Sequence, residues 1–220
     1  MWYRSRKYFV DENFFRYIET QDQAYILGYL YADGVVIPPY AFSVSSTDLE
    51  LLKNTREALR STHPISLARK VVEGKIFTIN TLLISCKQLV GDLINCGCIP
   101  RKSGGGLRFP EMLEGLQSHF IRGYFDGDGC VRVDSKNNLR VDFVGCFELL
   151  NDIKLSLEKY TAVGRVKIHP HGNVYRLEYS GNMNAKEIRE FMYKDAHFSL
   201  ERKKRLIFSI DPKYLPRKIL

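Results

Sequence analysis

Several features are absent from this sequence, and each absence excludes a class of protein. No apolar run approaches the ~20 residues that a membrane-spanning helix needs, and the first fifteen residues, MWYRSRKYFVDENFF, lack the apolar centre of a signal peptide. The five cysteines are an odd number and contain no C-x-x-C pair, which argues against disulfide and zinc scaffolds. We therefore predict a soluble intracellular protein with no membrane partner, located in cytoplasm, nucleoid or an organelle, with free and mostly buried thiols.

Acidic residues are also in the minority. Lysine and arginine together number 33 against 25 aspartates and glutamates, so the net charge is +8 and the isoelectric point is about 9.2. This balance favours a polyanionic partner such as nucleic acid. The 220 residues, 45% of them hydrophobic, suffice for one large domain or two small ones.

The chain repeats itself. ILGYLYADGVV at residues 26–36 aligns with IRGYFDGDGCV at 121–131, a shift of 121 − 26 = 95 residues. A β-rich stretch and a helical pattern follow each copy, DLELLKNTREAL in the first half and FELLNDIKLSLEKY in the second. Two strand-like runs come next, ISLARKVV with KIFTINTLLIS and GRVKIH with NVYRLEYS, and then a second helix, QLVGDLINCG or AKEIREFMYKDA. Each half thus reads α-β-β-α-β-β-α and closes on a basic tag, PRKS at 100–103 or ERKK at 201–204.

The duplication defines the predicted domains. SGGGLRFPE at 103–111 has the glycine and proline content of a linker. We expect an N-terminal half at 1–102, a linker at 103–117 and a C-terminal half at 118–220. The predicted fold class is α+β, in two pseudo-symmetric halves that each hold a four-stranded antiparallel sheet, as in a dimer fused into one chain.

Each repeated motif is expected to be a helix with one face of small residues. Thr20 and Gln23 form a capping box at the start of the first helix. Gly34 and Gly129 are expected to end the two helices in a conformation with positive φ. Within the helices, the pairs Gly28/Ala32 and Gly123/Gly127 are each four residues apart. Faces without bulky side chains predict that the two motif helices pack against each other.

That packing would bring together Asp33 and Asp128, each of which precedes the terminal glycine of its motif. Two carboxylates at two helix C-termini repel each other and the negative ends of the helix dipoles, so they call for a divalent cation. Oxygen ligands suit magnesium, which shares its shell with water and substrate phosphate. Alternatively, both aspartates merely occupy helix-ending turns, where Asp is common; the recurrence of the motif argues against this.

The two windows, 26–34 and 121–129, resemble the nine-residue signature of LAGLIDADG homing endonucleases, in the single-chain form with two motifs. The resemblance implies a central pair of motif helices, two sheets forming a DNA-binding saddle, and a monomer with internal pseudo-twofold symmetry. It assigns the metal-binding catalytic acids to Asp33 and Asp128, with Ala32 and Gly127 beside them in the metal site. The sixth motif position is usually Asp in this family. Asp126 matches it and Tyr31 does not, a difference that is expected to affect the contacts at the helix end more than the activity.

The resemblance also places a lysine near the scissile phosphate in each half, which nominates Lys102 and Lys203. Such a lysine would stabilise transition-state charge or help to deprotonate a water; a solvated charge run is the alternative for both tags. The implied reaction is magnesium-dependent hydrolysis of both strands of double-stranded DNA by in-line attack of an activated water. Mn²⁺ is expected to substitute for Mg²⁺, and Ca²⁺ to support binding without cleavage.

Alternating basic and apolar side chains on the strands are candidates for DNA contact. The candidates are Arg69, Lys70, Lys75, Arg132, Arg140, Lys167, His169, Asn173 and Arg176. A merely solvated strand face has the same pattern. The first hairpin, VVIPPYAF, is nearly uncharged whereas its counterpart carries DSKNNLR, which predicts a long, non-palindromic target.

Three other functions remain open. The first is a cleavage-deficient relative that binds DNA or RNA, such as an intron maturase or a transcription factor; the two intact acids argue against it. The second is an endonuclease embedded in an intein, for which the sequence shows no flanking splicing block. The third is a zinc-dependent binding protein, disfavoured because Cys96 and Cys98 are too close together and no paired ligands follow.

Overall fold

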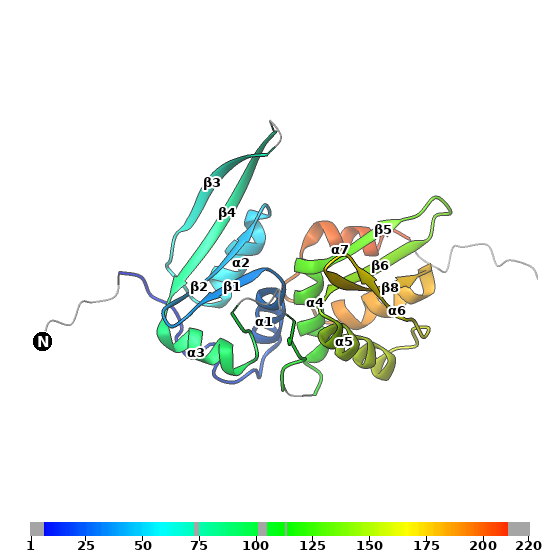
Figure 1. Ribbon diagram of the computed structural model, residues 1–220, viewed down its shortest axis with the longest axis horizontal. Coiled ribbons are helices and arrows are strands. Elements are labelled where there is room, and N and C mark those ends of the chain that lie inside the picture. Colours follow the sequence, from blue (N-terminus) through cyan, green and yellow to red (C-terminus); the bar gives the residue numbers. More distant parts are fainter. Residues whose placement is uncertain (1–6, 73–74, 101–104, 113, 211–220) are drawn as a thin grey trace, which may run out of the picture.

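The computed structural model describes residues 7–72, 75–100, 105–112 and 114–210, and they form two halves of the same design (Figure 1). The first half contains α1 (Gln21–Asp33), β1 (Gly34–Ile37), β2 (Ala41–Ser46), α2 (Leu49–Ala58), β3 (Ile65–Val72), β4 (Lys75–Ser85) and α3 (Lys87–Asn95). The second contains α4 (Gln117–Asp128), β5 (Gly129–Val133), β6 (Leu139–Gly145), α5 (Phe147–Tyr160), β7 (Ile168–His171), β8 (Val174–Ser180), α6 (Asn182–Tyr193) and α7 (Glu201–Ile207).

The α+β class and the α-β-β-α-β-β-α order of each half are confirmed. Two details differ from the sequence prediction. The strand expected over GRVKIH begins only at Ile168, and the second basic tag lies inside an additional helix, α7.

Each half is built around one antiparallel sheet. The strand orders, β1-β2-β4-β3 and β5-β6-β8-β7, are the same in the two halves. Alternate residues of each sheet are buried on one face, which packs against helices: α2 and α3 on the first sheet and α5 and α6 on the second. The buried strand residues include Val36, Phe42, Val44, Leu82 and Ile84 in the first sheet and Val131, Val141, Phe143, Leu177 and Tyr179 in the second. The intervening residues point to the opposite face, which these helices leave uncovered.

The two motif helices lie side by side between the sheets, as predicted (Figure 1). A Cβ atom built on Gly28 would lie 2.0 Å from the carbonyl oxygen of Phe120, and one built on Gly123 would lie 2.0 Å from the carbonyl oxygen of Tyr25. The contact is therefore reciprocal about the pseudo-twofold axis. Only glycine at both positions permits the two backbones to approach so closely.

The capping box at the start of α1 is confirmed, since the N–H of Gln23 donates to Thr20 Oγ1 at 3.3 Å and the N–H of Thr20 donates to Gln23 Oε1 at 2.9 Å. The prediction of positive φ at the helix ends is wrong. Gly34 has φ −73° and Gly129 has φ −88°, and both begin a strand directly. Glycine is required there by close packing on the preceding turn, because an added Cβ would lie 2.5 Å from the carbonyl oxygen of Leu30 or Phe125.

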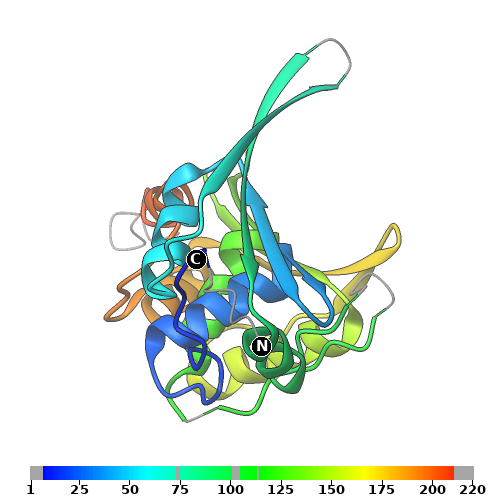
Figure 2. The same cartoon turned by 90° about the vertical axis from the view of Figure 1, so that its left-hand side faces the viewer.

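The halves differ most in their second hairpins. The β3–β4 hairpin is long and projects away from the body, whereas β7 and β8 are short (Figure 2). No helix in the part of the chain that the structure describes is long and apolar enough to cross a membrane.

We predict that Gly28→Ala and Gly123→Ala each destabilise the protein, because the new methyl group would collide with the backbone of the facing helix. Such overpacking costs about 1–3 kcal/mol. The matched control is Gly91→Ala, since Gly91 lies inside α3, is exposed and has no atom within 4 Å of an added Cβ. This control should gain about 0.5–1 kcal/mol from helix propensity. Urea unfolding followed by circular dichroism measures all three; equal stability of Gly28→Ala and wild type would contradict the packing.

Candidate active site

Asp33 and Asp128 are the last residues of α1 and α4, and both side chains are exposed. An added Cβ on Gly127 would lie 2.3 Å from Ala32 Cβ and 3.2 Å from Asp33 Oδ2, so the first carboxylate adjoins the end of the other helix. Burial raises the pKa of Tyr124, and the negative charges of Asp128 and Asp33 both raise it further. The structure thus brings both acids to one place, with Ala32 and Gly127 in contact between them.

The donor set fits a hard divalent cation. Carboxylate oxygens are the ligands that Mg²⁺ prefers, and an exposed site leaves room for water and substrate phosphate. Within the described residues, no group of three or more His, Cys, Asp or Glu side chains could enclose a metal. Asp33 and Asp128 are therefore residues that could hold Mg²⁺ here.

Lys203, on α7, lies at the end of the second motif helix. Its side chain is only 6% exposed, and Nζ faces four carbonyl oxygens: Phe125 at 2.7 Å, Asp126 at 2.9 Å, Gly127 at 3.2 Å and Gly129 at 2.6 Å. Three of these carbonyls belong to the last turn of α4 and the fourth, that of Gly129, begins β5; the carbonyl of Phe125 also accepts the N–H of Gly129. Burial lowers the pKa of Lys203 to about 8, and the charges of Asp126 and Asp33 act in the opposite direction.

The surroundings of Lys203 favour a role in offsetting negative charge at the end of α4. Its ammonium sets a positive charge against the negative end of α4, on either side of Asp128. Because its protons are committed to backbone carbonyls, the group is poorly placed to abstract a proton from water. Lys102, its counterpart in the prediction, lies outside the residues that the structure describes.

The sixth position of each motif joins the helix to the loop that ends its own half. Asp126 is buried, and its Oδ2 accepts hydrogen bonds from the N–H of Leu200 at 2.7 Å and from the hydroxyl of Tyr25 at 2.8 Å. In the first half, Tyr31 donates its hydroxyl to the carbonyl oxygen of Cys96 at 2.5 Å. The departure from Asp to Tyr therefore changes the helix-end contact, and both side chains still tether the same kind of loop.

Arg122 is a buried residue whose importance the sequence analysis missed. Its Nε donates to the carbonyl oxygen of Phe198 at 2.8 Å and its Nη1 to that of Met192 at 2.6 Å, and its guanidinium lies over the ring of Tyr25. It thereby ties α4 to the segment after α6. An arginine among the apolar residues of the second motif was the available signal, because a buried cation needs partners.

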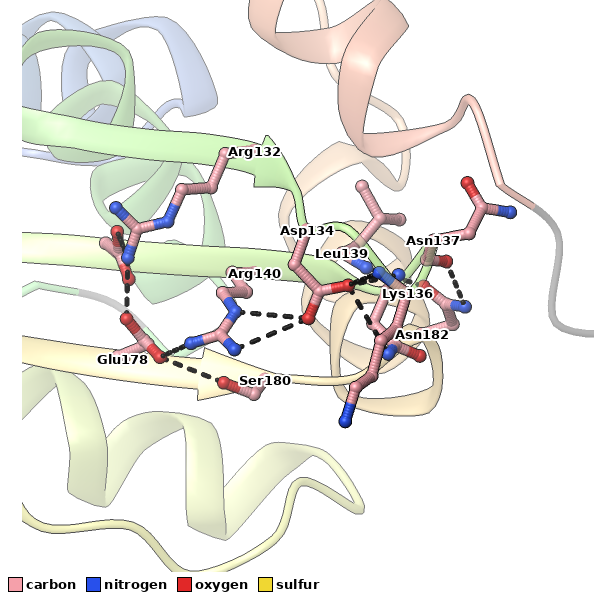
Figure 3. A network of polar contacts seen from close by, with 11 residues as sticks. Arg132, Asp134, Lys136, Asn137, Leu139, Arg140, Glu178, Ser180 and Asn182 are labelled. Atoms are coloured by element: carbon pink, nitrogen blue, oxygen red, sulfur yellow. Dashed lines mark hydrogen bonds and ion pairs between the residues drawn. The ribbon is translucent and has the colours of Figure 1, made fainter.

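The predicted DNA contacts fall into three groups. Arg69 is exposed on β3; Lys70 and Lys75 belong to β3 and β4, but their side chains lie outside what the structure describes. In the second half, Lys167, His169 and Asn173 are exposed at the β7–β8 hairpin. Arg176 donates from Nη2 to the ring of His171 at 2.8 Å. Arg132 and Arg140 take part in a network of ion pairs on the uncovered face of the second sheet (Figure 3).

We predict that Lys203→Met destabilises the fold by at least about 2 kcal/mol, because it removes a buried ammonium that donates to several backbone carbonyls at the end of α4. The neighbouring Lys204→Met is the control. Lys204 is only partly buried and lies 6.0 Å from the ring of Tyr193, so its loss should cost less than about 0.5 kcal/mol. Chemical denaturation of the two variants tests this; a stable Lys203→Met would show that the α4 terminus does not need the ammonium.

The buried carboxyl of Asp126 is expected to make the stability of the protein depend on pH. Burial raises its pKa from 3.8 to about 6, against the hydrogen bonds from Tyr25 and Leu200 and the charges of Lys203 and Arg122. The folded state thus holds the proton more tightly than the unfolded state, so this group's contribution to stability falls as the pH rises from about 4 to about 6.

Asp126→Asn keeps an acceptor oxygen and removes the titration. We expect the stability of this variant relative to wild type to increase by about 2 kcal/mol between pH 4 and pH 7, since part of the effect, at ~1.4 kcal/mol for each unit of pKa shift, is already present at pH 4. Urea unfolding of both proteins at the two pH values measures the difference. A difference that does not vary with pH would refute the shifted pKa.

A comparison with protein-family models finds a match in the second half of the chain. Residues 115–192 match the family model described as the LAGLIDADG-like domain, a span that contains the second motif. A comparison with the sequences of curated proteins finds no match.

Solved structures match over most of the chain. Full-length DUF199/WhiA from Thermatoga maritima is 15% identical with a TM-score of 0.55, and the match covers 90% of this chain and 64% of that one. The LAGLIDADG meganuclease I-AabMI bound to uncleaved DNA is 12% identical with a TM-score of 0.52, covering 83% of this chain and 86% of that one. Meganuclease I-SmaMI bound to DNA is 11% identical with a TM-score of 0.55, covering 80% and 85%. The chain therefore carries a LAGLIDADG-like domain in its second half and, over both halves, has the fold shared by LAGLIDADG meganucleases and WhiA.

Proposed function

We propose that this protein is a site-specific homing endonuclease that hydrolyses both strands of a long, non-palindromic double-stranded DNA target with Mg²⁺, acting as a monomer. The observation that carries the proposal is the meeting of Asp33 and Asp128 at the adjoining C-termini of α1 and α4. Two exposed carboxylates at the adjoining negative ends of two helix dipoles repel each other, which favours the binding of a cation there. Metal-dependent chemistry gives both of them a purpose.

Each acid is assigned to one DNA strand. Asp33 and Asp128 end helices related by the pseudo-twofold axis, so they address the two strands of a duplex placed across that axis. Mg²⁺, when bound, lowers the pKa of a water and offsets the charge that develops on the phosphodiester. Asp33 and Asp128 would hold the metal beside the scissile phosphates. Lys203 limits the negative potential at the end of α4, next to Asp128.

The basic balance of the chain and the uncovered sheet faces supply the DNA-binding surface. A β-ribbon fits the major groove, and the two sheets can follow the groove on either side of the cleavage site. Because the sheets differ in hairpin length and in charge, the two half-sites that they contact differ in sequence.

The similarity in fold to WhiA as well as to meganucleases favours a second candidate: a DNA-binding protein of this fold that does not cleave. Such a protein needs neither acid. The two candidates make the same prediction for binding and opposite predictions for cleavage, so a single experiment distinguishes them.

In that experiment, the protein is incubated with a randomised duplex library and Mg²⁺, and the DNA ends are sequenced. We expect staggered double-strand breaks at one asymmetric sequence, cleavage with Mn²⁺, and binding without cleavage in Ca²⁺. Tight binding without breaks in any divalent cation would replace the endonuclease by the second candidate.

We predict that Asp33→Asn and Asp128→Asn each abolish double-strand cleavage of the selected site, by at least about 10³-fold, while affinity in Ca²⁺ changes little. Glu111→Gln, an exposed acid in the segment between the halves, is the control and should cleave normally. Cleavage is followed on a supercoiled plasmid, which separates nicking from linearisation. Undiminished linearisation by either Asp variant contradicts the assignment of the acids.

A further inference from the structure

The uncovered face of the second sheet carries arginines that are already held by carboxylates (Figure 3). Glu178, on β8, lies between two of them: its Oε2 is 2.7 Å from Arg132 Nη2 and its Oε1 is 2.9 Å from Arg140 Nη1. Arg132 and Arg140 are direct cross-strand partners on β5 and β6. One carboxylate thus bridges two neighbouring guanidinium groups.

Two further acids support the same pair. Asp142, a cross-strand partner of Glu178, lies 3.1 Å from Arg132 Nη2, and its side chain is only 2% exposed. Asp134 Oδ2 lies 3.4 Å from Arg140 Nη2, and Asp134 Oδ1 accepts the backbone N–H groups of Lys136 and Asn138. The acids are thus anchored by the sheet and its turn, whereas the arginine side chains remain 42% and 38% exposed.

The charge balance of this network argues against phosphate as its ligand. Asp134, Asp142 and Glu178 offset the charges of Arg132, Arg140 and the neighbouring Arg176, so the cluster has little net positive charge with which to attract a phosphate. The arginines nevertheless keep donors to offer. Each guanidinium has five N–H protons, and the carboxylates make two contacts with Arg132 and three with Arg140, so both side chains keep protons for a neutral acceptor. A guanine presents such acceptors, O6 and N7, in the major groove, and arginine is the residue that most often binds them.

Building on the proposed DNA-binding function, we propose that Glu178 is a positioning residue that orients Arg132 and Arg140 to read guanines in the half-site contacted by the second sheet. A long arginine side chain loses rotamer freedom when it binds, and a carboxylate that fixes its plane beforehand removes part of that cost. The same carboxylates lower the affinity for DNA backbone in general. The network therefore lowers the affinity for DNA of any sequence and raises the preference for particular bases.

At the matching register of the first sheet, the described residues form no such network. The cross-strand pair Ile37 and Ala41 occupies the register of Arg132 and Arg140, and Ser43 and Leu83 occupy that of Asp142 and Glu178. None of these four side chains is charged. The guanine preference should therefore be confined to one half of the site, at the positions facing β5 and β6.

The test is selection of bound duplexes from a randomised library in Ca²⁺, with the full chain as wild type, Arg132→Gln, Arg140→Gln and Glu178→Gln. We expect guanine at two positions of one half-site in the wild-type consensus, and loss of one preference in each arginine variant. Glu178→Gln should weaken both preferences about tenfold while binding to unrelated DNA becomes tighter. Glu190→Gln, on α6 at the other face of the sheet, is the control and should keep the wild-type consensus.

The outcomes separate this inference from the function on which it rests. Failure of wild type to bind any duplex would overturn the DNA-binding function itself. Tight binding with a consensus that Glu178→Gln leaves unchanged overturns only the role of Glu178. A Glu178→Gln protein that melts at the wild-type temperature but has lost both guanine preferences supports positioning, because a purely structural role would alter stability and leave base choice alone.

Discussion

The backbone contact between α1 and α4 at Gly28 and Gly123 is the constraint on which the rest of the structure depends. Each half buries its apolar strand face under its own helices, so the halves could in principle stand apart. The helix pair joins the two halves. Because glycine has no side chain, Gly28 and Gly123 determine how close the two helices lie. That separation in turn fixes how far apart the two helix C-termini lie, and hence where Asp33 and Asp128 are placed. The site is therefore a consequence of the interface between the halves.

This arrangement concentrates negative charge. The ends of α1 and α4 each combine the negative end of a helix dipole with a carboxylate. At α4 the ammonium of Lys203 meets four carbonyls directly, and the buried carboxyl of Asp126 lies close enough to keep the pKa of that lysine from falling further. At α1 the sixth position is the neutral Tyr31, whose hydroxyl binds a loop carbonyl instead. The two acids thus sit in different electrostatic surroundings although the backbone around them is duplicated.

Local signals explain what the sequence could predict. The capping box of Thr20 and Gln23 depends on residues that are three positions apart. Strands such as ISLARKVV and KIFTINTLLIS show an alternation of side-chain types. The positions of these elements were therefore predicted correctly. The helix pair was also accessible, because small residues recur four apart in both copies. The conformation of Gly34 and Gly129 could not be predicted. A glycine at a helix end can serve either a positive φ or a close packing contact, and only the packing against the preceding turn shows which of the two applies.

Contacts between distant segments set the limit for the site. Lys203 reads as part of a solvated basic run, and its burial arises only because α7 docks on the end of α4, some 75 residues earlier in the chain. Arg132 and Arg140 were predicted as DNA contacts from alternation alone, but their partner Glu178 comes from β8, and register places it between them.

The duplicated fold also explains why the two halves can diverge on one face and not on another. Positions that point into the core, or that bring α1 and α4 together, are constrained by packing, so Gly28 and Gly123 have the same role in both copies. Positions on the uncovered sheet faces have no such constraint from within the protein. There the first half has Ile37 and Leu83 where the second has Arg132 and Glu178. Buried positions differ too, as with Tyr31 and Asp126, but each such change needs new partners in the core, whereas the uncovered faces can change freely. Under the proposed function, this freedom lets one fold contact two different half-sites.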